Sequence, residues 1–304
     1  MTSTVTGDVL LTGGSGQVGI EILRQAPATM NVVAPRRGEL DLGDPDAILA
    51  LVASRPWAAV INCGAYTAVD RAQSDVVEAW RANALGPAAL AQACAAAQIP
   101  LIHVSTDYVF DGSKPGIYTE ADPVAPLGVY GGSKEAGEQA VRTAAPRHVI
   151  LRTAWVVSPH GSNFIKTMLR LAETRPEIRV VDDQRGCPTS AADIAATLLK
   201  ITGRMIANPQ TAPRGTYHFV NDGEASWCEL ARAVFEMAAA RGCPTPRVEA
   251  ITTAEYPTPA RRPANSRLSV AKLRADYGIE PRPWRAAVED IVEALLPAKQ
   301  EQGL

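Results

Sequence analysis

The chain has 304 residues, of which 46% are hydrophobic and 20% are charged, and its formal net charge at pH 7 is −2. This length allows one large α/β domain or two modest domains with a sizeable core, and the composition excludes a disordered chain. The small net charge excludes the broad basic surface that a nucleic-acid partner requires.

The chain has no run of about 18 apolar residues and no signal-peptide pattern at its start, so we expect no membrane segment and no membrane partner. Its five cysteines are scattered and include no Cys-x-x-Cys pair. Such usage is typical of reduced thiols, so we expect a cytoplasmic protein. The four histidines form no local ligand pair, and we expect no zinc site.

Short apolar runs alternate with helical patterns in the first half of the chain. The runs that predict strands are residues 8–11, 31–34, 58–61, 101–104 and 149–151. The patterns that predict helices are residues 17–25, a segment that opens at Asp44-Pro45, residues 75–97 and residues 128–144. Strands and helices that alternate at this spacing favour an α/β fold with a Rossmann-type, doubly wound parallel sheet.

The alternation fades after residue 153, where proline becomes frequent. Helices are predicted there at residues 161–174, 190–203, 226–240 and 284–296. We therefore expect a first domain over residues 1–152, with residues 190–208 returning to it. Residues 153–304 are expected to form mainly a smaller, mostly C-terminal substrate-binding domain, because long ordered loops often carry binding residues.

A glycine-rich turn follows the first predicted strand, in the stretch LLTGGSGQVG. It places Gly13, Gly16 and Gly19 in a G-x-x-G-x-x-G pattern that opens the first predicted helix. Glycines permit the tight turn and let the backbone approach a pyrophosphate, whose charge meets the helix N-terminus. The pattern predicts that residues 1–152 bind a dinucleotide, and the alternative is a plain strand-to-helix turn.

The second predicted strand runs into the stretch APRR, which contains Arg36 and Arg37 and no acid. An acid there would favour NAD, whereas two arginines suit the 2′-phosphate of NADPH. We therefore expect NADPH, with NADH as the second choice, and the alternative is that both arginines are solvated loop charges. Asp41 and Leu42 follow where an acid and an apolar side chain would lie beside the adenine.

Tyr130 and Lys134 lie four residues apart in a predicted helix and therefore on one face of it. A tyrosine has an ordinary pKa of about 10, and a neighbouring ammonium group lowers that pKa. The pair predicts a proton donor for a carbonyl–alcohol couple, although Tyr-x-x-x-Lys alone also occurs by chance. Thr106 strengthens the prediction, because it follows the fourth strand at the sheet edge where ligands bind and would stabilise charge on a carbonyl oxygen.

These features together resemble the extended short-chain dehydrogenase/reductases. Within that family, the chain is similar to the dTDP-4-dehydrorhamnose reductases over nearly its whole length. The segments that carry the resemblance are TGGSGQVG (12–19), VINCGAYTAVDRAQS (60–74), HVSTDYVFDG (103–112), YGGSKEAGE (130–138), LRTAWV (151–156), NFIKTMLRLA (163–172), VVDDQRGCPTSAADIA (180–195) and YPTPARRPANSRLS (256–269). The last two are much more specific than the first, because epimerases and dehydratases share the glycine-rich turn and the Tyr-x-x-x-Lys pair.

The resemblance implies an NAD(P)H-dependent enzyme that reduces the C4 ketone of dTDP-6-deoxy-L-lyxo-4-hexulose. It implies that Tyr130 donates the proton and that Lys134 binds the nicotinamide ribose and tunes Tyr130. The other cofactor contacts that it implies are Gly16, Gln17, Val18, Asp41, Leu42, Gly64, Ala65 and Tyr66. For Tyr66, a packing role in the core is the alternative.

The substrate would be a dTDP-linked 4-keto-6-deoxyhexose. The resemblance implies that Thr106 and Asp107 contact it and that Trp155 lies against the sugar. Asn163 and Arg262 are further candidates for substrate binding. The alternatives are a turn cap for Asp107 and a core position for Trp155. For Asn163 the alternative is a helix N-cap, and for Arg262 it is a solvated charge.

Some members of the family hold a Mg²⁺ ion between subunits, and Glu21 aligns with one of its ligands. The remaining ligands cannot be assigned, so both the Mg²⁺ site and the choice between a monomer and a homodimer stay open. Two other functions also stay open. One is a sugar-nucleotide epimerase or dehydratase of the same family, although Tyr108 stands where a dehydratase would need a second acid. The other is a non-catalytic regulatory subunit, which the intact catalytic set argues against.

Overall fold

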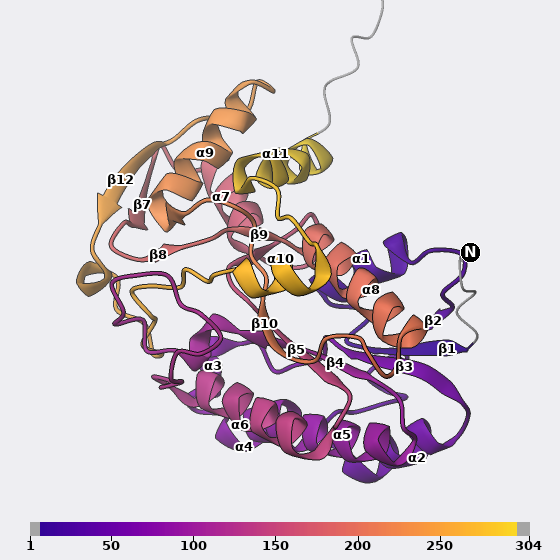
Figure 1. Ribbon diagram of the computed structural model, residues 1–304. Coiled ribbons are helices and arrows are strands. Elements are labelled where there is room, and N and C mark those ends of the chain that lie inside the picture. Colours follow the sequence, from indigo (N-terminus) through magenta and orange to yellow (C-terminus); the bar gives the residue numbers. More distant parts are fainter. Residues whose placement is uncertain (1–6, 297–304) are drawn as a thin grey trace, which may run out of the picture.

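The computed structural model describes residues 7–296 and has a six-stranded sheet at its centre (Figure 1). The strand order is β10-β5-β4-β3-β1-β2, and every neighbouring pair runs parallel. The strands are β1 (Asp8–Thr12), β2 (Val32–Val33), β3 (Trp57–Asn62), β4 (Leu101–Thr106), β5 (His148–Thr153) and β10 (Gly215–His218). The first strand, β1, lies inside the sheet, and β2 forms one edge beside it. The chain then crosses back over β1 and adds β3, β4, β5 and β10 toward the other edge. This order confirms the predicted doubly wound, Rossmann-type fold.

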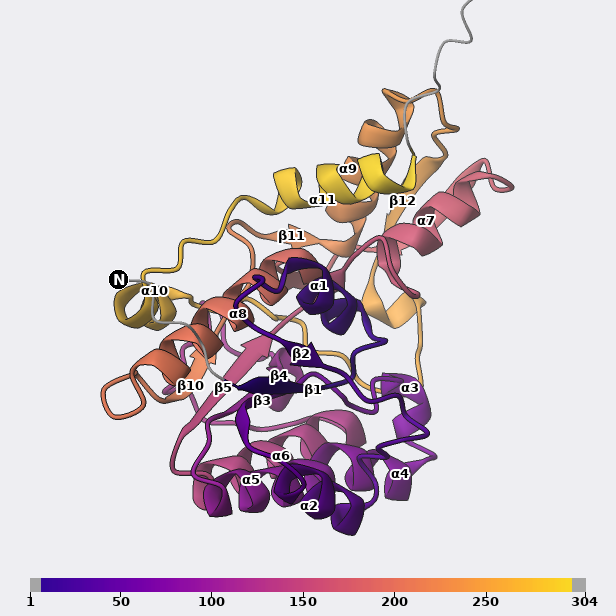
Figure 2. The ribbon, with the colours of Figure 1, turned by 90° about the vertical axis from the view of Figure 1, so that its right-hand side faces the viewer.

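Helices cover both faces of the sheet, because its strands are apolar on both sides. Figure 2 shows one group of helices below the sheet and another above it. The lower group is α2 (Pro45–Ala53), α5 (Gly86–Ala96) and α6 (Val129–Ala144), and the upper group is α1 (Gln17–Gln25), α8 (Ala191–Ala207) and α10 (Ala271–Tyr277). Leu90 and Val141 fill the core below the sheet, and Ile22, Leu198 and Leu273 fill the core above it.

The structure confirms the helix predicted over residues 75–97, since the segment is helical without a break from residue 76 to residue 96. It consists of α4 (Val76–Trp80), a π-helical turn η1 (Arg81–Leu85) and α5. Pro87 explains the π-helical turn, because it has no N–H to donate to the carbonyl group of Asn83, four residues earlier. The buried side chain of Asn83, in this turn, holds the backbone of Tyr66. The Asn83 amide donates to the carbonyl oxygen of Tyr66 at 3.0 Å and accepts from the N–H of Tyr66 at 2.8 Å.

The second half of the chain forms a smaller lobe beside the sheet, seen at the upper left of Figure 1. Its core lies between three helices and a two-stranded parallel sheet, and Ile165, Phe235 and Val288 are among its buried residues. The helices are α7 (Phe164–Ala172), α9 (Trp227–Ala239) and α11 (Trp284–Leu295), and the strands are β7 (Glu177–Val181) and β12 (Arg247–Ile251). Two short pairs connect this lobe to the sheet region: β6 (Val156–Val157) with β9 (Thr189–Ser190), and β8 (Arg185–Gly186) with β11 (Ala225–Ser226).

The division of the chain at residue 152 stays a prediction. The main sheet extends beyond that point, since it takes β10 as its edge strand and packs against α8 and α10. Residues 190–208, which we expect to return to the first domain, contain α8, whose buried face joins the core of the main sheet. Across residues 7–296, no helix is both long enough and apolar enough to cross a membrane.

Candidate active site

A cavity of about 930 Å³ opens at the carboxyl ends of β1, β3, β4 and β5, the edge where parallel sheets bind ligands. It brings together most of the residues that the sequence predicts for the cofactor and the substrate. These are Gly13, Gly16, Gln17, Val18, Gly19, Arg37, Asp41, Leu42, Gly64, Ala65, Tyr66, Thr106, Asp107, Tyr130, Lys134 and Trp155. Arg36, Asn163 and Arg262 do not line it.

The glycine-rich turn has the geometry that an anion site requires. Gly13 has φ 72°, a left-handed conformation that favours glycine, and a Cβ atom there would come within 2.6 Å of the backbone nitrogen of Gly64. Helix α1 follows with Gly16 as its N-cap, and no side chain caps it. Its first N–H groups are therefore available to a ligand, and this cradle fits the pyrophosphate of a dinucleotide.

The two arginines after β2 are not equivalent. Arg37 lines the cavity, whereas Arg36 lies outside it and donates its backbone N–H to the Glu39 carboxylate at 2.7 Å. Asp41 accepts from the N–H of Gly43 at 2.9 Å, so its carboxylate shapes the loop at this end of the cavity. Of the two arginines after β2, only Arg37 lines the cavity.

Thr106 ends β4 and organises the other end of the cavity. Its hydroxyl donates to the Asp107 carboxylate at 3.0 Å and accepts from the N–H of Tyr108 at 3.2 Å. The ring of Tyr108 meets the ring of Tyr130 edge to face, with centroids 5.4 Å apart. Thr106 and Tyr130 therefore meet in one small region, which places a hydroxyl donor beside the predicted proton donor.

The electrostatics of Tyr130 differ from the prediction. Burial raises the pKa of Tyr130 to about 12, and a hydrogen bond with Thr106 offsets this only in part. The expectation that the Lys134 ammonium lowers the pKa of Tyr130 is not met, because the ammonium nitrogen of Lys134 instead donates to the carbonyl oxygen of Val104 at 2.7 Å. Burial also lowers the pKa of Lys134 to about 8.

Asp107 is buried at the same end of the cavity. Burial raises the pKa of its carboxyl group to about 6, although hydrogen bonds from Ser266 and Thr106 act in the opposite direction. One carboxylate oxygen, Oδ2, is buried and has no hydrogen-bond partner within residues 7–296. Buried polar atoms are normally hydrogen-bonded, so an unpaired oxygen of this kind marks Asp107 as a candidate functional group.

An ion pair that the sequence did not predict lies beneath the site. Glu138 follows Lys134 by one helical turn and is fully buried. Its carboxylate accepts from Arg152 on β5 at 2.8 and 2.7 Å, and from Arg142 at 2.8 Å. The pKa of Lys134 is raised by Glu138 and lowered more strongly by burial. The i, i+4 spacing from Lys134 was the available signal, but the partner strand could not be identified from it.

Trp155 lines the cavity in an unusual backbone conformation. It has φ 49°, and its ring stacks on Trp227 with centroids 3.6 Å apart. Gly186 also lies against the ring, and a Cβ atom there would come within 2.4 Å of it. Trp227, from the smaller lobe, therefore fixes the aromatic surface that Trp155 presents to the cavity.

The side chains of Tyr66 and Arg262 both donate to neighbouring carboxylates. The Tyr66 hydroxyl donates to Asp75 at 3.0 Å. The Arg262 guanidinium forms a two-pronged pair with the Asp70 carboxylate, at 3.1 and 2.7 Å, and links the C-terminal loop to α3 (Val69–Ala72). Both side chains of this ion pair are partly exposed, so the substrate contact and the surface-charge alternative for Arg262 both stay predictions.

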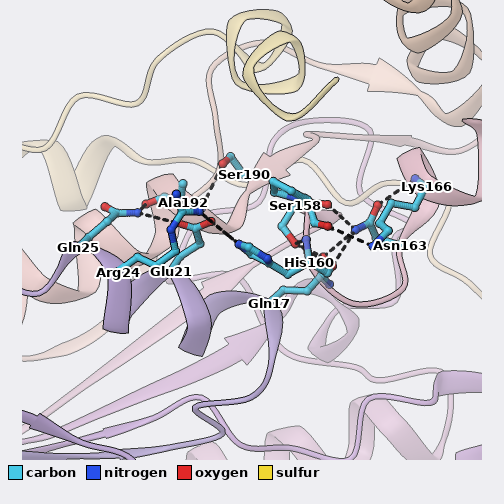
Figure 3. A network of polar contacts seen from close by, with 11 residues as sticks. Gln17, Glu21, Arg24, Gln25, Ser158, His160, Asn163, Lys166, Ser190 and Ala192 are labelled. Carbon is cyan, nitrogen blue, oxygen red and sulfur yellow. Dashed lines mark hydrogen bonds and ion pairs between the residues drawn. The ribbon is translucent and has the colours of Figure 1, made fainter. Parts of the chain in front are cut away.

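Asn163 and Glu21 both lie where the smaller lobe meets α1 (Figure 3). Asn163 is the N-cap of α7, as its structural alternative predicts, and it also donates to Gln17 at 3.0 Å. The buried Glu21 carboxylate accepts from His160 at 2.8 Å and from Arg24 and Gln25 at 3.2 Å each. Residues 7–296 contain no cluster of three or more metal-type ligands, so Glu21 stays a predicted ligand without described partners.

A tyrosine and a lysine one helical turn apart, beside a dinucleotide turn in a doubly wound sheet, define a nicotinamide-dependent oxidoreductase of the short-chain type. Comparisons with known proteins identify the family within this class. Residues 7–296 match the family model of the RmlD substrate binding domain. The dTDP-4-dehydrorhamnose reductase of Sinorhizobium fredii is 44% identical over 94% of this chain and 97% of its own length.

Solved structures agree. A dTDP-4-dehydrorhamnose reductase from Clostridium acetobutylicum superposes with a TM-score of 0.88 at 35% identity, over 95% of this chain and 99% of that one. The enzyme from Bacillus anthracis, in complex with NADP, has a TM-score of 0.87 at 32% identity, over 94% of this chain and 98% of that one. The chain belongs to the RmlD family, that of the dTDP-4-dehydrorhamnose reductases.

Proposed function

We propose that this protein reduces the C4 ketone of dTDP-6-deoxy-L-lyxo-4-hexulose to give dTDP-L-rhamnose, with NADPH as the hydride donor. One observation carries the proposal: Thr106, Tyr130 and Lys134 line the same cavity as the uncapped phosphate turn. The family and the names of its members point to this substrate.

The chain's own residues supply acid catalysis and orientation. When bound, the nicotinamide supplies the hydride for the ketone carbon. Tyr130 gives its phenolic proton to the ketone oxygen, and its raised pKa keeps that proton in place at neutral pH. The Thr106 hydroxyl, which donates to Asp107 in this structure, would turn to donate to the same oxygen as negative charge develops. Lys134 contributes its positive charge beside the reacting groups.

The pH dependence follows from Lys134. The ammonium form is present below a pKa of about 8 and is lost as the pH rises through that value. We therefore expect kcat/KM for reduction to fall above about pH 8. The effect would appear as the basic limb of a pH profile measured with saturating NADPH.

We further propose that the cofactor preference comes from Arg37. Its place in the cavity lining suits a 2′-phosphate, which guanidinium groups bind through paired hydrogen bonds. NADH would bind the same site without this contact. The glycine-rich turn and Lys134 would contact groups that NADH and NADPH share, so the site would hold either dinucleotide.

The sugar nucleotide would lie toward the smaller lobe. Trp155 and Asp107 both line the cavity, so the Trp155 ring would lie against the deoxyhexose and the Asp107 carboxylate would accept from a sugar hydroxyl. Arg262 would bind the diphosphate by exchanging its Asp70 partner for a phosphate group. Free cysteines throughout the described chain suit a reducing compartment, and we propose a cytoplasmic enzyme that acts as a monomer or a homodimer.

The alternative of a 4,6-dehydratase receives less support. Elimination of water needs a second acid after Asp107, but Tyr108 occupies that position and packs against Tyr130. Burial and the Asp107 charge raise the pKa of Tyr108 well above its ordinary value, which makes it a poor acid. A regulatory subunit would have no need of the catalytic set.

The test is the loss of NADPH absorbance with dTDP-6-deoxy-L-lyxo-4-hexulose, for the wild type beside Tyr130→Phe and with NADH in parallel. We expect turnover in the wild type and a loss of about 10²- to 10⁴-fold in the variant, because a positioned acid contributes about that much. NADPH binding should be retained in the variant. A wild type that binds NADPH without consuming it would overturn the substrate assignment.

A further inference from the structure

A network of polar side chains connects the phosphate turn to the segment before α7 (Figure 3). Gln17 is the first residue of α1 and lines the cavity. Its side-chain oxygen, Oε1, accepts from the Ser158 hydroxyl at 2.7 Å and from the Asn163 amide at 3.0 Å. These contacts bring residues about 140 positions apart in the sequence into direct contact.

Asn163 can present only its N–H groups to Gln17. Its nitrogen, Nδ2, also lies 2.7 Å from the carbonyl oxygen of Ser158 and 3.3 Å from that of His160, and a carbonyl oxygen can only accept. Its oxygen, Oδ1, is used for the N-cap of α7, where it accepts from the N–H of Lys166 at 3.3 Å. The orientation of the Asn163 amide is therefore fixed from both ends.

The fixed amide of Asn163 determines the orientation of Gln17. Two donors facing each other would repel, so the atom of Gln17 nearest Asn163 must be its oxygen. The amide nitrogen of Gln17 must then face the other way. No acceptor within residues 7–296 forms a hydrogen bond with that nitrogen, and Gln17 lines the cavity at the uncapped N-terminus of α1.

A second contact fixes the same segment one turn further along α1. His160 lies 2.8 Å from the buried Glu21 carboxylate. Between these two points of attachment, Gly161 and Ser162 reach the lining of the cavity. The segment that precedes α7 is thus docked on the phosphate-binding helix, and not on the sugar end of the site.

We infer that Asn163 is a positioning residue for the cofactor, and that it acts through Gln17 by turning the Gln17 amide N–H groups toward the anionic diphosphate. The inference rests on the proposed dinucleotide binding and replaces the substrate contact predicted for Asn163. Ser158 is its partner in this role, since its hydroxyl lies 2.7 Å from the same oxygen of Gln17 and shares its one proton between that oxygen and the carbonyl oxygen of His160 at 3.0 Å.

The experiment measures NADPH binding by fluorescence titration without any sugar nucleotide. Asn163→Ser removes the amide donor, keeps a neutral N-cap hydroxyl and should preserve α7. We expect this variant and Gln17→Ala each to raise the Kd for NADPH about tenfold, because hydrogen bonds to charged groups are worth that much. The double variant should bind about as weakly as either single variant, since both changes remove the same contact.

Thr167→Val is the matched control. It removes a hydroxyl that donates to the backbone oxygen of Asn163 at 2.9 Å and leaves the Asn163 amide intact. We expect its Kd for NADPH to equal that of the wild type. If Asn163→Ser does not fold, Ser158→Ala removes the other donor to Gln17 with little change in volume, and it should raise the Kd by about threefold.

The outcomes separate the two proposals. If the wild type does not bind NADPH, the proposed function fails and this inference falls with it. If the wild type binds NADPH and Asn163→Ser binds it equally well, only the inference is overturned. The inference also fails if the effects of Asn163→Ser and Gln17→Ala multiply in the double variant, or if Asn163→Ser raises only the KM for the sugar nucleotide.

Discussion

Asp107 allows a direct test of the electrostatics of the site. Its carboxyl group is buried beside Thr106, and burial raises its pKa from 3.8 to about 6. At neutral pH the folded protein therefore holds an unfavourable buried negative charge. Asp107→Asn replaces that charge with a neutral group of nearly the same shape, so the variant should be more stable than the wild type.

The size of the effect and its pH dependence follow from the two pKa values. Below pH 3.8 the carboxyl group is protonated in both the folded and the unfolded chain, and it has no effect on the free energy of unfolding. As the pH rises, the unfolded chain releases its proton first, so the stability of the wild type falls until the folded group also ionises near pH 6. Each unit of pKa difference is worth about 1.36 kcal/mol, so Asp107→Asn should gain about 1 kcal/mol at pH 4.5 and about 3 kcal/mol at pH 7.5.

The assay is urea unfolding of both proteins at these two pH values. Asp122→Asn provides a control of opposite sign, because hydrogen bonds from Lys114 and Thr119 lower the pKa of Asp122 to about 2. That carboxylate stabilises the fold above pH 3.8 and loses its effect as the pH falls through about 2, so its variant should be less stable at both pH values. A gain for Asp107→Asn that is the same at pH 4.5 and 7.5, or a loss at both, would refute the reasoning.

Three further changes test other parts of the site. Arg37→Ala should lower kcat/KM with NADPH about ten- to a hundredfold and leave NADH use nearly unchanged, whereas Arg36→Ala should spare both; equal losses in the two variants would contradict the assignment. Gly186→Ala puts a methyl group about where the Trp155 ring lies, so it should destabilise the fold by about 1–3 kcal/mol and raise the KM for the sugar nucleotide; an unchanged Tm would argue against this packing. Arg152→Leu leaves a buried carboxylate without its main partner and should cost about 3–5 kcal/mol in urea unfolding, and a loss below about 1 kcal/mol would show that the pair is not buried as described.

The sequence was sufficient to predict the elements whose structure depends on residues close together in the chain. The glycine-rich turn, the strand that ends at Thr106 and the helix that carries Tyr130 and Lys134 each have a local pattern, and the structure brings all of them to one cavity. Periodicity located these elements because each buries a face against the same sheet. The roles of the individual residues remain predictions.

The parts that sequence reasoning missed depend on contacts between distant segments. β10 is a four-residue strand whose place is defined by its pairing with β5. Trp227 supports Trp155 from a helix of the other lobe, and Arg152 reaches Glu138 from a neighbouring strand. No local pattern shows that such partners meet.

The sign of a pKa shift is equally hard to obtain from a sequence. Spacing placed Lys134 one turn from Tyr130 but could not show how deeply both are buried, and burial decides the pKa of each. The same holds for Asn163, whose N-cap role the sequence allowed. Its contact with Gln17 depends on a fold in which α7 returns to α1.

Because β10 comes late in the chain, the main sheet stays incomplete for much of the time that the protein is being synthesised. β5 leaves the ribosome well before β10, and until then its outer edge lacks a partner. The apolar surface that α8 and α10 later cover stays open until residue 277 has emerged. Open strand edges and apolar faces promote association with other chains, so we expect the growing polypeptide to be prone to aggregation until these segments have emerged. Mutations that slow the arrival of β10 would therefore lower the yield of protein in the cell even where they leave the finished enzyme unchanged.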